Sequence, residues 1–475
     1  MVWGTRALAA TLVGILVALL SLAWYAPEAL PFLPLALVGL CGIAVLSRYP
    51  LANLGVVLAG FVFAVNSDEG LQISEVVYGL YLYAYVFFWY ARRLLRGDKI
   101  LFSATDRAAL LFIVGGAFLG VAMALVFGAS LSDLRSDLTA FLVLALYFPV
   151  KEACRCAPRG PDVIVYVLIG LGIFLGIQNF IVFRSIISSA TLAWQVADAR
   201  FAATEALIMI SSSGVLFLLL DAERWRHRLG LLVLLLFMLA SLILTKGRTF
   251  WMAFAFGTVL SLLFLGGRQR FRLIFLTTVG SAVLVLITVT FFGQLADLVF
   301  SGTLRRLATL QDASSQDLSL IARFIEWNAL WDYIVRNPVL GYGFGTTYQF
   351  YDIMDVGTVD RTFTHNGYLG AWFKLGIFGL LVLLFLWVSG IWDAVVVYRT
   401  RLLSERYRTY ALLSIVSLAA LALAANASIF FIYMNQLFPF ALLTGMASGL
   451  RQRNLSLVGQ SRAAAVQAHT AGSAL

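Results

Sequence analysis

Long apolar segments recur along almost the whole chain and restrict its fold more than any other feature. A transmembrane helix needs about 20 mostly apolar residues. Fourteen segments approach this length: 7–25, 28–47, 51–65, 71–91, 107–128, 133–150, 162–183, 203–220, 229–246, 249–266, 271–292, 366–391, 408–430 and 434–450. Hydrophobic residues make up 61% of the chain and charged residues only 12%, about half the ~25% of soluble domains. The sequence therefore excludes a soluble enzyme and predicts an all-α, polytopic membrane helix bundle with about 12–14 transmembrane helices, since 51–65 is short.

Basic residues lie mainly in the short loops on one side of these segments. With the N-terminus placed in the cytoplasm, 23 of the 34 lysines and arginines fall on the cytoplasmic side and 11 on the other. This asymmetry is the positive-inside pattern, so we expect both termini to be cytoplasmic. The same pattern accounts for the net charge of +10, and we predict no nucleic-acid partner.

The hydropathy pattern divides the chain into four topological segments. We expect an N-terminal transmembrane bundle (1–292), a large outer loop containing short helices (293–365), C-terminal transmembrane helices (366–450) and a disordered cytoplasmic tail (451–475). In the outer loop, apolar residues at alternating three- and four-residue steps predict an amphipathic helix: Leu320, Phe324, Trp327, Trp331 and Ile334. Asn337-Pro338 ends this pattern. We expect the helix to lie along the membrane surface or to cover a cavity, with its tryptophans at the interface.

Ionisable residues that a membrane protein retains are candidates for its functional site. Four stand on the outer side: Arg200 before the 203–220 segment, Arg248 in a turn between two segments, Arg323 in the amphipathic helix and His365 at the end of the outer loop. Each has a structural alternative, because the arginines can bind lipid phosphates, Arg323 can pair with Glu326, and a lone histidine can cap a helix. The other two of the three histidines lie among cytoplasmic arginines and in the tail, so we favour His365 as a functional residue.

Other motifs give weaker signals. Asp68 and Glu69 are adjacent carboxylates at an outer helix end and are an alternative cation site or base. The run Gly341–Gly345 lacks the strand and helix of a dinucleotide fingerprint and predicts a tight turn. The sequence contains no zinc-protease, serine-hydrolase or P-loop motif. We therefore predict no metal and no cofactor.

Four motifs together resemble the O-antigen ligase/polymerase family of lipid-linked glycan transferases of the bacterial inner membrane. They are Thr245-Lys246-Gly247-Arg248, the Arg323–Trp327 segment, the Asn337–Gly345 segment and the His365–Gly376 segment. The resemblance covers roughly 240–390 and implies a transferase at the periplasmic face that uses undecaprenyl-diphosphate-linked glycans. It implies His365 as the base and Arg248 and Arg200 as ligands of the diphosphate, with Arg323 a looser match. The family usually has Ser-Arg-Gly in the first motif, so Lys246 is an alternative to Arg248.

Physical chemistry is consistent with that assignment. A transferase outside the cytoplasm has no ATP and needs an activated donor, and a lipid diphosphate sugar is one. Its leaving group is a stable anion, so arginines that bind phosphate oxygens serve it better than an acid does. An acceptor hydroxyl needs a base that titrates near neutrality, such as an imidazole. Direct displacement would invert the anomeric carbon, which predicts a metal-independent, inverting glycosyltransferase.

Two other classes of protein remain as alternatives. A polytopic transporter, either a flippase of lipid-linked sugars or a permease for small solutes, would place polar groups near the bilayer centre. Few are present: Gln178-Asn179, Glu75 and Glu205. A non-catalytic assembly scaffold would have no need of a histidine among arginines. Within the enzyme class, the acceptor can be another glycan, lipid A–core or a protein, which leaves ligase, polymerase and protein O-glycosyltransferase open.

Overall fold

The chain separates by packing into two compact units, Met1–Gly97 and Asp98–Leu475. The computed structural model describes residues 49–64, 73–189, 205–280, 282, 286, 318–353, 356–400 and 403–472. The predicted segments 1–292, 293–365 and 366–450 concern sidedness in a membrane rather than packing, and they stay predictions. The expected helices 7–25 and 28–47 and the end of 271–292 lie outside the described residues.

In the first unit, tyrosine hydroxyls join the helices. The elements are α3 (Pro50–Ala59), η2 (Gly60–Ala64) and α4 (Ile73–Arg96). The Tyr78 hydroxyl donates to the Val57 carbonyl oxygen at 3.0 Å, and the Tyr81 hydroxyl donates to Asn53 Oδ1 at 2.6 Å. Because polar groups inside an apolar protein need such partners, these bonds fix α4 against α3.

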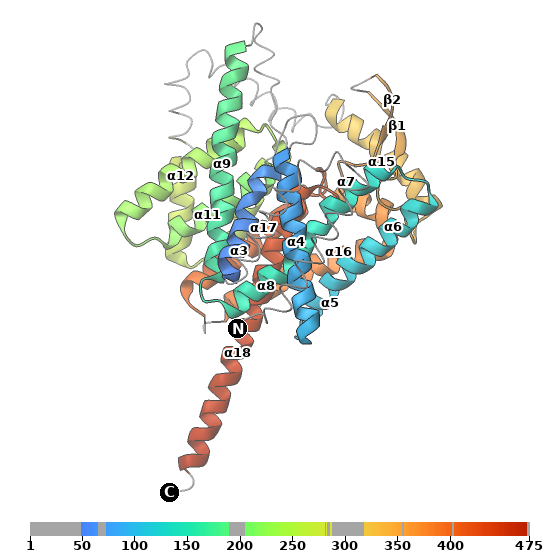
Figure 1. The fold of residues 1–475 in the computed structure, drawn as a ribbon. Helices are drawn as coiled ribbons and strands as arrows, with labels where there is room; N and C mark the ends of the chain where they lie inside the picture. Colours follow the sequence, from blue (N-terminus) through green and yellow to red (C-terminus); the bar gives the residue numbers. More distant parts are fainter. Residues whose placement is uncertain are drawn as a thin grey trace. The chain divides into compact units, whose positions relative to one another are not determined.

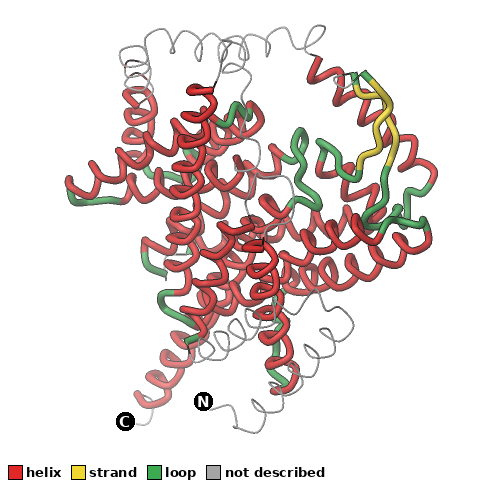
Figure 2. Tube along the Cα trace, turned by 45° about the horizontal axis from the view of Figure 1, so that its top comes forward, coloured by secondary structure: helices red, strands yellow, loops and turns green. Residues whose placement is uncertain are grey.

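The second unit is a helix bundle with one β-hairpin (Figures 1 and 2). Its elements are α5 (Ala104–Leu110), η3 (Leu111–Gly115), α6 (Gly116–Val126), α7 (Leu131–Leu142), η4 (Val143–Leu146), α8 (Tyr147–Cys156), α9 (Gly160–Ser189), α11 (Glu205–Asp221), α12 (Trp225–Leu244), α13 (Arg248–Ser261), α15 (Leu318–Arg336), β1 (Tyr348–Asp352), β2 (Gly357–Arg361), α16 (Gly367–Arg399), α17 (Glu405–Ala424) and α18 (Met434–Gly472). Helices α11 and α17 are buried along most of their length, and they form the core.

Five helical segments within the described residues are long and apolar enough to cross a membrane. They are Ala104–Val126, Gly160–Ser189, Trp225–Leu244, Gly367–Arg399 and Glu405–Ala424. The predicted all-α, polytopic membrane fold is therefore confirmed. The segment predicted at 133–150 is also helical, but it changes from α7 through the 3-10 turn η4 to α8.

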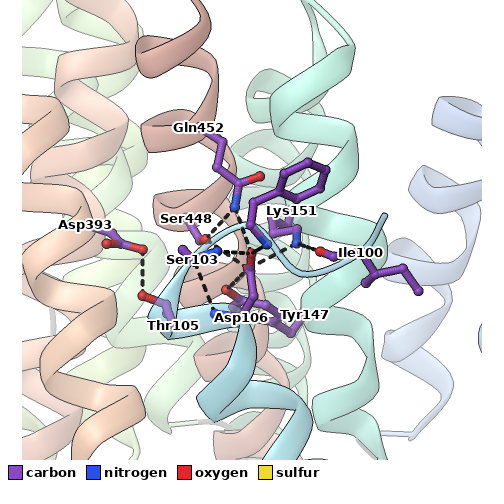
Figure 3. A network of polar contacts seen from close by, with 10 residues as sticks. Ile100, Ser103, Thr105, Asp106, Tyr147, Lys151, Asp393, Ser448 and Gln452 are labelled. Carbon is purple, nitrogen blue, oxygen red and sulfur yellow. Dashed lines mark hydrogen bonds and ion pairs between the residues drawn. The ribbon is translucent and has the colours of Figure 1, made fainter. Parts of the chain in front are cut away.

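A buried carboxylate joins several helices by hydrogen bonds at one end of this bundle (Figure 3). Asp106 accepts hydrogen bonds from Lys151 Nζ at 3.0 Å, from the Tyr147 hydroxyl at 2.9 Å and from Gln452 Nε2 at 3.0 Å. Lys151 also donates to the Ile100 carbonyl oxygen at 2.6 Å. A buried ion pair needs such additional partners. The network joins α5, α8 and α18 at the end that the charge distribution predicts to be cytoplasmic.

Helix α18 continues into the segment 451–475, for which the sequence predicts a disordered cytoplasmic tail, and that expectation stays a prediction. Helix α18 continues to Gly472, and Figure 1 shows it extending beyond the other helices of the second unit. The tail is rich in alanine, glutamine and arginine, which favour helix, and it contains no proline. Its first residues bond to the bundle, as the contact of Gln452 with Asp106 shows.

The outer loop contains more regular structure than the expected short helices. Its helix α15 has 19 residues and ends at Arg336, directly before Asn337-Pro338, as the sequence predicts. After it, β1 pairs antiparallel with β2, with Tyr348 opposite Arg361 and Asp352 opposite Gly357. Burial alternates along β1, so the hairpin turns one face towards α15 and α16.

Candidate functional site

His365 and Glu326 come together where the outer loop meets α16. His365 Nδ1 lies 2.9 Å from Glu326 Oε2, and the His365 backbone N–H donates to Glu326 Oε1 at 3.0 Å. Glu326 is 1% exposed, whereas the His365 side chain is 32% exposed. A carboxylate beside Nδ1 favours the proton on that nitrogen, which leaves a lone pair on Nε2. The ring is therefore held in place and can accept a proton at Nε2.

Tyr348 supplies the third hydrogen bond to this carboxylate. Its hydroxyl donates to Glu326 Oε1 at 2.7 Å and lies 2.8 Å from the Phe363 carbonyl oxygen. Burial, and then the neighbouring Glu326, raise the pKa of Tyr348, so the phenol stays protonated and donates. Burial acts to raise the pKa of Glu326, but the hydrogen bonds and charge of His365 and the bond from Tyr348 outweigh it and lower that pKa. The carboxylate is thus ionised at neutral pH.

The buried face of α15 differs from the apolar stripe predicted from the sequence. Glu326, Leu330 and Ile334 are all 1% exposed or less, and they pack towards β1 and α16. Phe324 and Trp331, which belong to the predicted apolar stripe, are 56% and 45% exposed. The helix has apolar residues on two faces, and the fold buries the face that includes Glu326. The face with the exposed aromatic residues suits a membrane surface.

A glycine-rich segment, residues 341–345, packs closely against three helices. The Phe344 N–H donates to the Gly120 carbonyl oxygen in α6 at 2.9 Å, and the Gly343 N–H donates to the Lys374 carbonyl oxygen in α16 at 2.9 Å. Gly343 has a φ of +89°. A Cβ on Gly343 would lie 2.1 Å from the Ala124 nitrogen. The predicted tight turn is therefore confirmed, and its glycines permit close backbone packing.

A buried ion pair fixes the chain directly before β1. Lys374 Nζ lies 3.0 Å from Asp137 Oδ2 and donates to the Thr346 carbonyl oxygen at 2.7 Å. The Gly345 N–H donates to the same Asp137 oxygen at 2.6 Å. Both charged side chains are nearly inaccessible, at 1% and 6% exposure. Since Tyr348 follows two residues later, this pair positions the strand that supports Glu326.

The basic turn, residues 245–248, lies against the start of α11. Gly247 is the residue before α13, and a Cβ there would lie 2.4 Å from Glu205 Oε1. Lys246 is 7% exposed and has a φ of +53°, in the left-handed region that non-glycine residues rarely adopt. Arg248 is the first residue of α13 and is half-buried. The turn thus holds two cations and a helix N-terminus close to one carboxylate.

The segment 425–433, between α17 and α18, connects this turn to the histidine. The Gly367 N–H, two residues after His365, donates to the Ala425 carbonyl oxygen at 2.8 Å. Burial, and then the Glu205 carboxylate, raise the pKa of Tyr433, so Tyr433 lies near that carboxylate. The segment therefore contacts the chain beside His365, and its Tyr433 lies within electrostatic range of Glu205. The basic turn and the histidine lie at the same end of the second unit.

The described residues include three of the four predicted site residues. His365 and Arg248 lie as given above, and Arg323 is half-buried on α15, one turn before Glu326. The bonds of Glu326 described above go to His365 and Tyr348. Arg200 lies outside the described residues, as do Asp68 and Glu69. Within the described part of the chain, no group of three or more His, Cys, Asp or Glu side chains is arranged to hold a metal ion.

Four residues that hold the site in place were not predicted from the sequence as site residues. They are Glu326, Tyr348, Asp137 and Lys374. Glu326 was visible only as a possible partner of Arg323, because their spacing is that of one helical turn. The one signal for Lys374 and Asp137 is that each is charged within an apolar segment.

Residues 232–384 match the family model described as O-antigen ligase. This range includes the basic turn, α13, α15, the hairpin and the first half of α16, and thus Arg248, Glu326 and His365. The predicted resemblance to an O-antigen ligase-like family is confirmed over these residues, and with the apolar helices the match supports a membrane protein of glycan assembly. No curated protein sequence matches the chain significantly.

Proposed function

We propose that this O-antigen ligase-like protein is a glycosyltransferase of the bacterial inner membrane. It transfers a glycan from an undecaprenyl-diphosphate-linked donor to an acceptor hydroxyl at the periplasmic face. The observation that carries the proposal is the buried, ionised Glu326, which binds both the backbone N–H and Nδ1 of His365. A carboxylate that fixes an imidazole in this way is the arrangement of a general base.

The reaction is a single displacement. The acceptor oxygen attacks the anomeric carbon of the donor while its proton moves to His365 Nε2. The bond between the anomeric carbon and the diphosphate oxygen breaks, and undecaprenyl diphosphate leaves with the electron pair. The new glycosidic bond has the inverted configuration. Glu326 stabilises the imidazolium that forms, because the negative charge lies beside Nδ1.

Cations at the same end bind the diphosphate. Arg248 stands at the first position of α13, where the positive end of the helix dipole also favours an anion. Its guanidinium can form two parallel hydrogen bonds with phosphate oxygens. Arg200 and Arg323 complete this set in our proposal, with Lys246 as an alternative to Arg248. Because arginines supply the positive charge, the proposed reaction is independent of metal.

The acceptor is a hydroxyl of another lipid-linked glycan, of lipid A–core or of a protein. All three share the same donor chemistry, so the proposal for His365 and the arginines is the same for a polymerase, a ligase and a protein O-glycosyltransferase. The family match to a ligase favours glycan assembly over permeation of small solutes.

The test is transfer by the purified protein in detergent, with a lipid-linked donor and a candidate acceptor. We expect product from the wild type and from His227→Ala, a change at an exposed histidine near the start of α12. We expect His365→Ala to lose activity by about 10²–10⁴ with normal protein yield. Absence of product from the wild type with every acceptor class, together with movement of the donor across vesicle membranes, would favour a flippase.

A further inference from the structure

An arginine-lined groove of about 1160 Å³ opens at the opposite end of α11 from Glu205. It lies between the end of α11, the start of α12 and the start of α17. Five arginines line it: Arg226, Arg228, Arg268, Arg272 and Arg406. The charge distribution predicts this end to be cytoplasmic, so the groove is distinct from the proposed transfer site.

Two of these arginines are fixed by backbone carbonyl groups at the end of α11. Arg228 Nε donates to the Ala222 carbonyl oxygen at 2.6 Å, and Arg272 Nη1 donates to the Leu220 carbonyl oxygen at 3.2 Å. A guanidinium has five N–H donors. Each therefore keeps further donors for a ligand, and the carbonyl bonds hold the two groups in place.

Arg406 pairs with Asp162 at 3.0 Å, whereas, among the described residues, the carboxylates that line the groove form no ion pair with its other four arginines. Asp221 accepts hydrogen bonds from Gln269 at 3.0 Å and from Thr409. Glu405 pairs with Arg408 at 2.7 Å. The third carboxylate, Glu223, lines the groove at an exposed position. In the part of the chain that the structure describes, no ion pair joins an acidic side chain to Arg226, Arg228, Arg268 or Arg272.

The wall of the groove changes from charged to apolar along α12. Arg226 lies near the start of this helix, whereas Leu231 and Leu234 line the groove further along it, with Leu218 of α11 opposite. Eight residues separate Arg226 from Leu234, which is about 12 Å along a helix. A ligand that fits both parts has an anionic group at one end and an aliphatic chain at the other.

We propose that this groove binds an anionic phospholipid from the cytoplasmic leaflet. The phosphodiester group contacts the arginines, and the first part of an acyl chain lies against Leu231 and Leu234. Basic pockets between transmembrane helices on the cytoplasmic side recognise lipid head groups in this way. The proposal does not depend on the transfer reaction, because it concerns other residues at the other end of the bundle.

The test measures how much phosphatidylglycerol stays bound to the purified full-length protein. The protein is exchanged into detergent with phosphatidylglycerol or phosphatidylcholine, and the bound lipid is counted by native mass spectrometry. We expect the wild type to retain phosphatidylglycerol selectively. The double change Arg228→Gln and Arg272→Gln should lower retention about tenfold, since it removes two charge-assisted contacts.

Two further variants keep the test decisive. Arg226→Gln with Arg268→Gln removes charges without touching the carbonyl bonds at α11, so it should fold normally and also lose lipid. Arg159→Gln with Arg399→Gln removes the same charge at exposed positions outside the groove and should retain lipid within about twofold. Equal loss in this control, or no loss in both groove variants, would overturn the proposal. Complete displacement of the lipid by millimolar inorganic phosphate would also overturn it, because the site would then be specific for phosphate alone.

Discussion

Replacing Glu326 by Gln isolates the role of the carboxylate, because the three bonds are divided between its two oxygens. Oε1 accepts from the His365 backbone and from Tyr348, and Oε2 faces His365 Nδ1. In Glu326→Gln, the amide oxygen can keep the first two bonds. The amide nitrogen then replaces Oε2 and donates to Nδ1. This moves the ring proton to Nε2 and removes the lone pair that accepts the substrate proton.

The expected effect on rate is much larger than the effect on folding. One charge-assisted hydrogen bond contributes about 1.5–3 kcal/mol to stability, and two of the three bonds survive. General base catalysis contributes about 10²–10⁴ in rate, and the same change from carboxylate to amide in a serine-protease triad costs about 10⁴. We therefore expect Glu326→Gln to lower kcat by at least about 10² and to leave the protein folded.

The assay is initial-rate transfer from a lipid-linked donor by purified protein in detergent, with elution volume and thermal unfolding as checks of folding. Asp332→Asn is the matched control, because Asp332 is an exposed carboxylate six residues later on α15. It should retain nearly full activity. If Glu326→Gln stays within about threefold of wild type while His365→Ala is inactive, the carboxylate does not set the tautomer of the base.

Three further predictions concern pH, the buried ion pair and the basic turn. The folded pKa of Glu326 lies below its usual 4.5, so its contribution to stability is present above about pH 4.5 and is lost as pH falls through the folded pKa. The difference in unfolding temperature between wild type and Glu326→Gln should therefore stay constant down to about pH 4.5 and shrink as pH falls further, and a difference that stays constant below about pH 4.5 would contradict this. Lys374→Met leaves Asp137 buried without its cation and should lower the free energy of unfolding by about 3–5 kcal/mol. The double variant Lys374→Met with Asp137→Leu should recover most of this loss. Thermal unfolding of the two variants measures both effects. Arg248→Lys should raise KM for the donor about tenfold, because a lysine cannot form the paired bonds with phosphate oxygens. Lys246→Gly, which relieves a φ of +53°, should leave KM near the wild-type value. The reverse result would assign the binding of the diphosphate to Lys246.

The bundle and the order of its helices could be predicted from the sequence, because the apolar segments have the length that a membrane requires. The end of α15 was also predictable, since proline excludes a helical conformation at the preceding residue. The buried face of α15 was not predictable. The face of α15 with Phe324 and Trp331 has a greater apolar surface than the face with Glu326. The face with Glu326 is nevertheless buried, because it contacts residues about 20–40 positions later in the chain.

The candidate histidine could be predicted from its rarity and its position, but its partner could not. Glu326 and His365 are 39 residues apart, and the hairpin between them sets their distance. The three-residue spacing of Arg323 and Glu326 predicted a local ion pair between them instead of the distant contact between Glu326 and His365. A glutamate next to an apolar stripe usually lies at a solvated edge, so nothing in the sequence indicated that Glu326 is buried.

The stereochemistry of transfer tests the proposed single displacement most directly. A lipid-linked donor of known anomeric configuration is incubated with purified wild-type protein and acceptor, and the new glycosidic bond is assigned by NMR. With His365 as the base for the acceptor hydroxyl, the product has the inverted configuration, and His365→Ala forms almost none of it. A product with retained configuration would contradict the account, because it requires two successive displacements and a nucleophile on the protein.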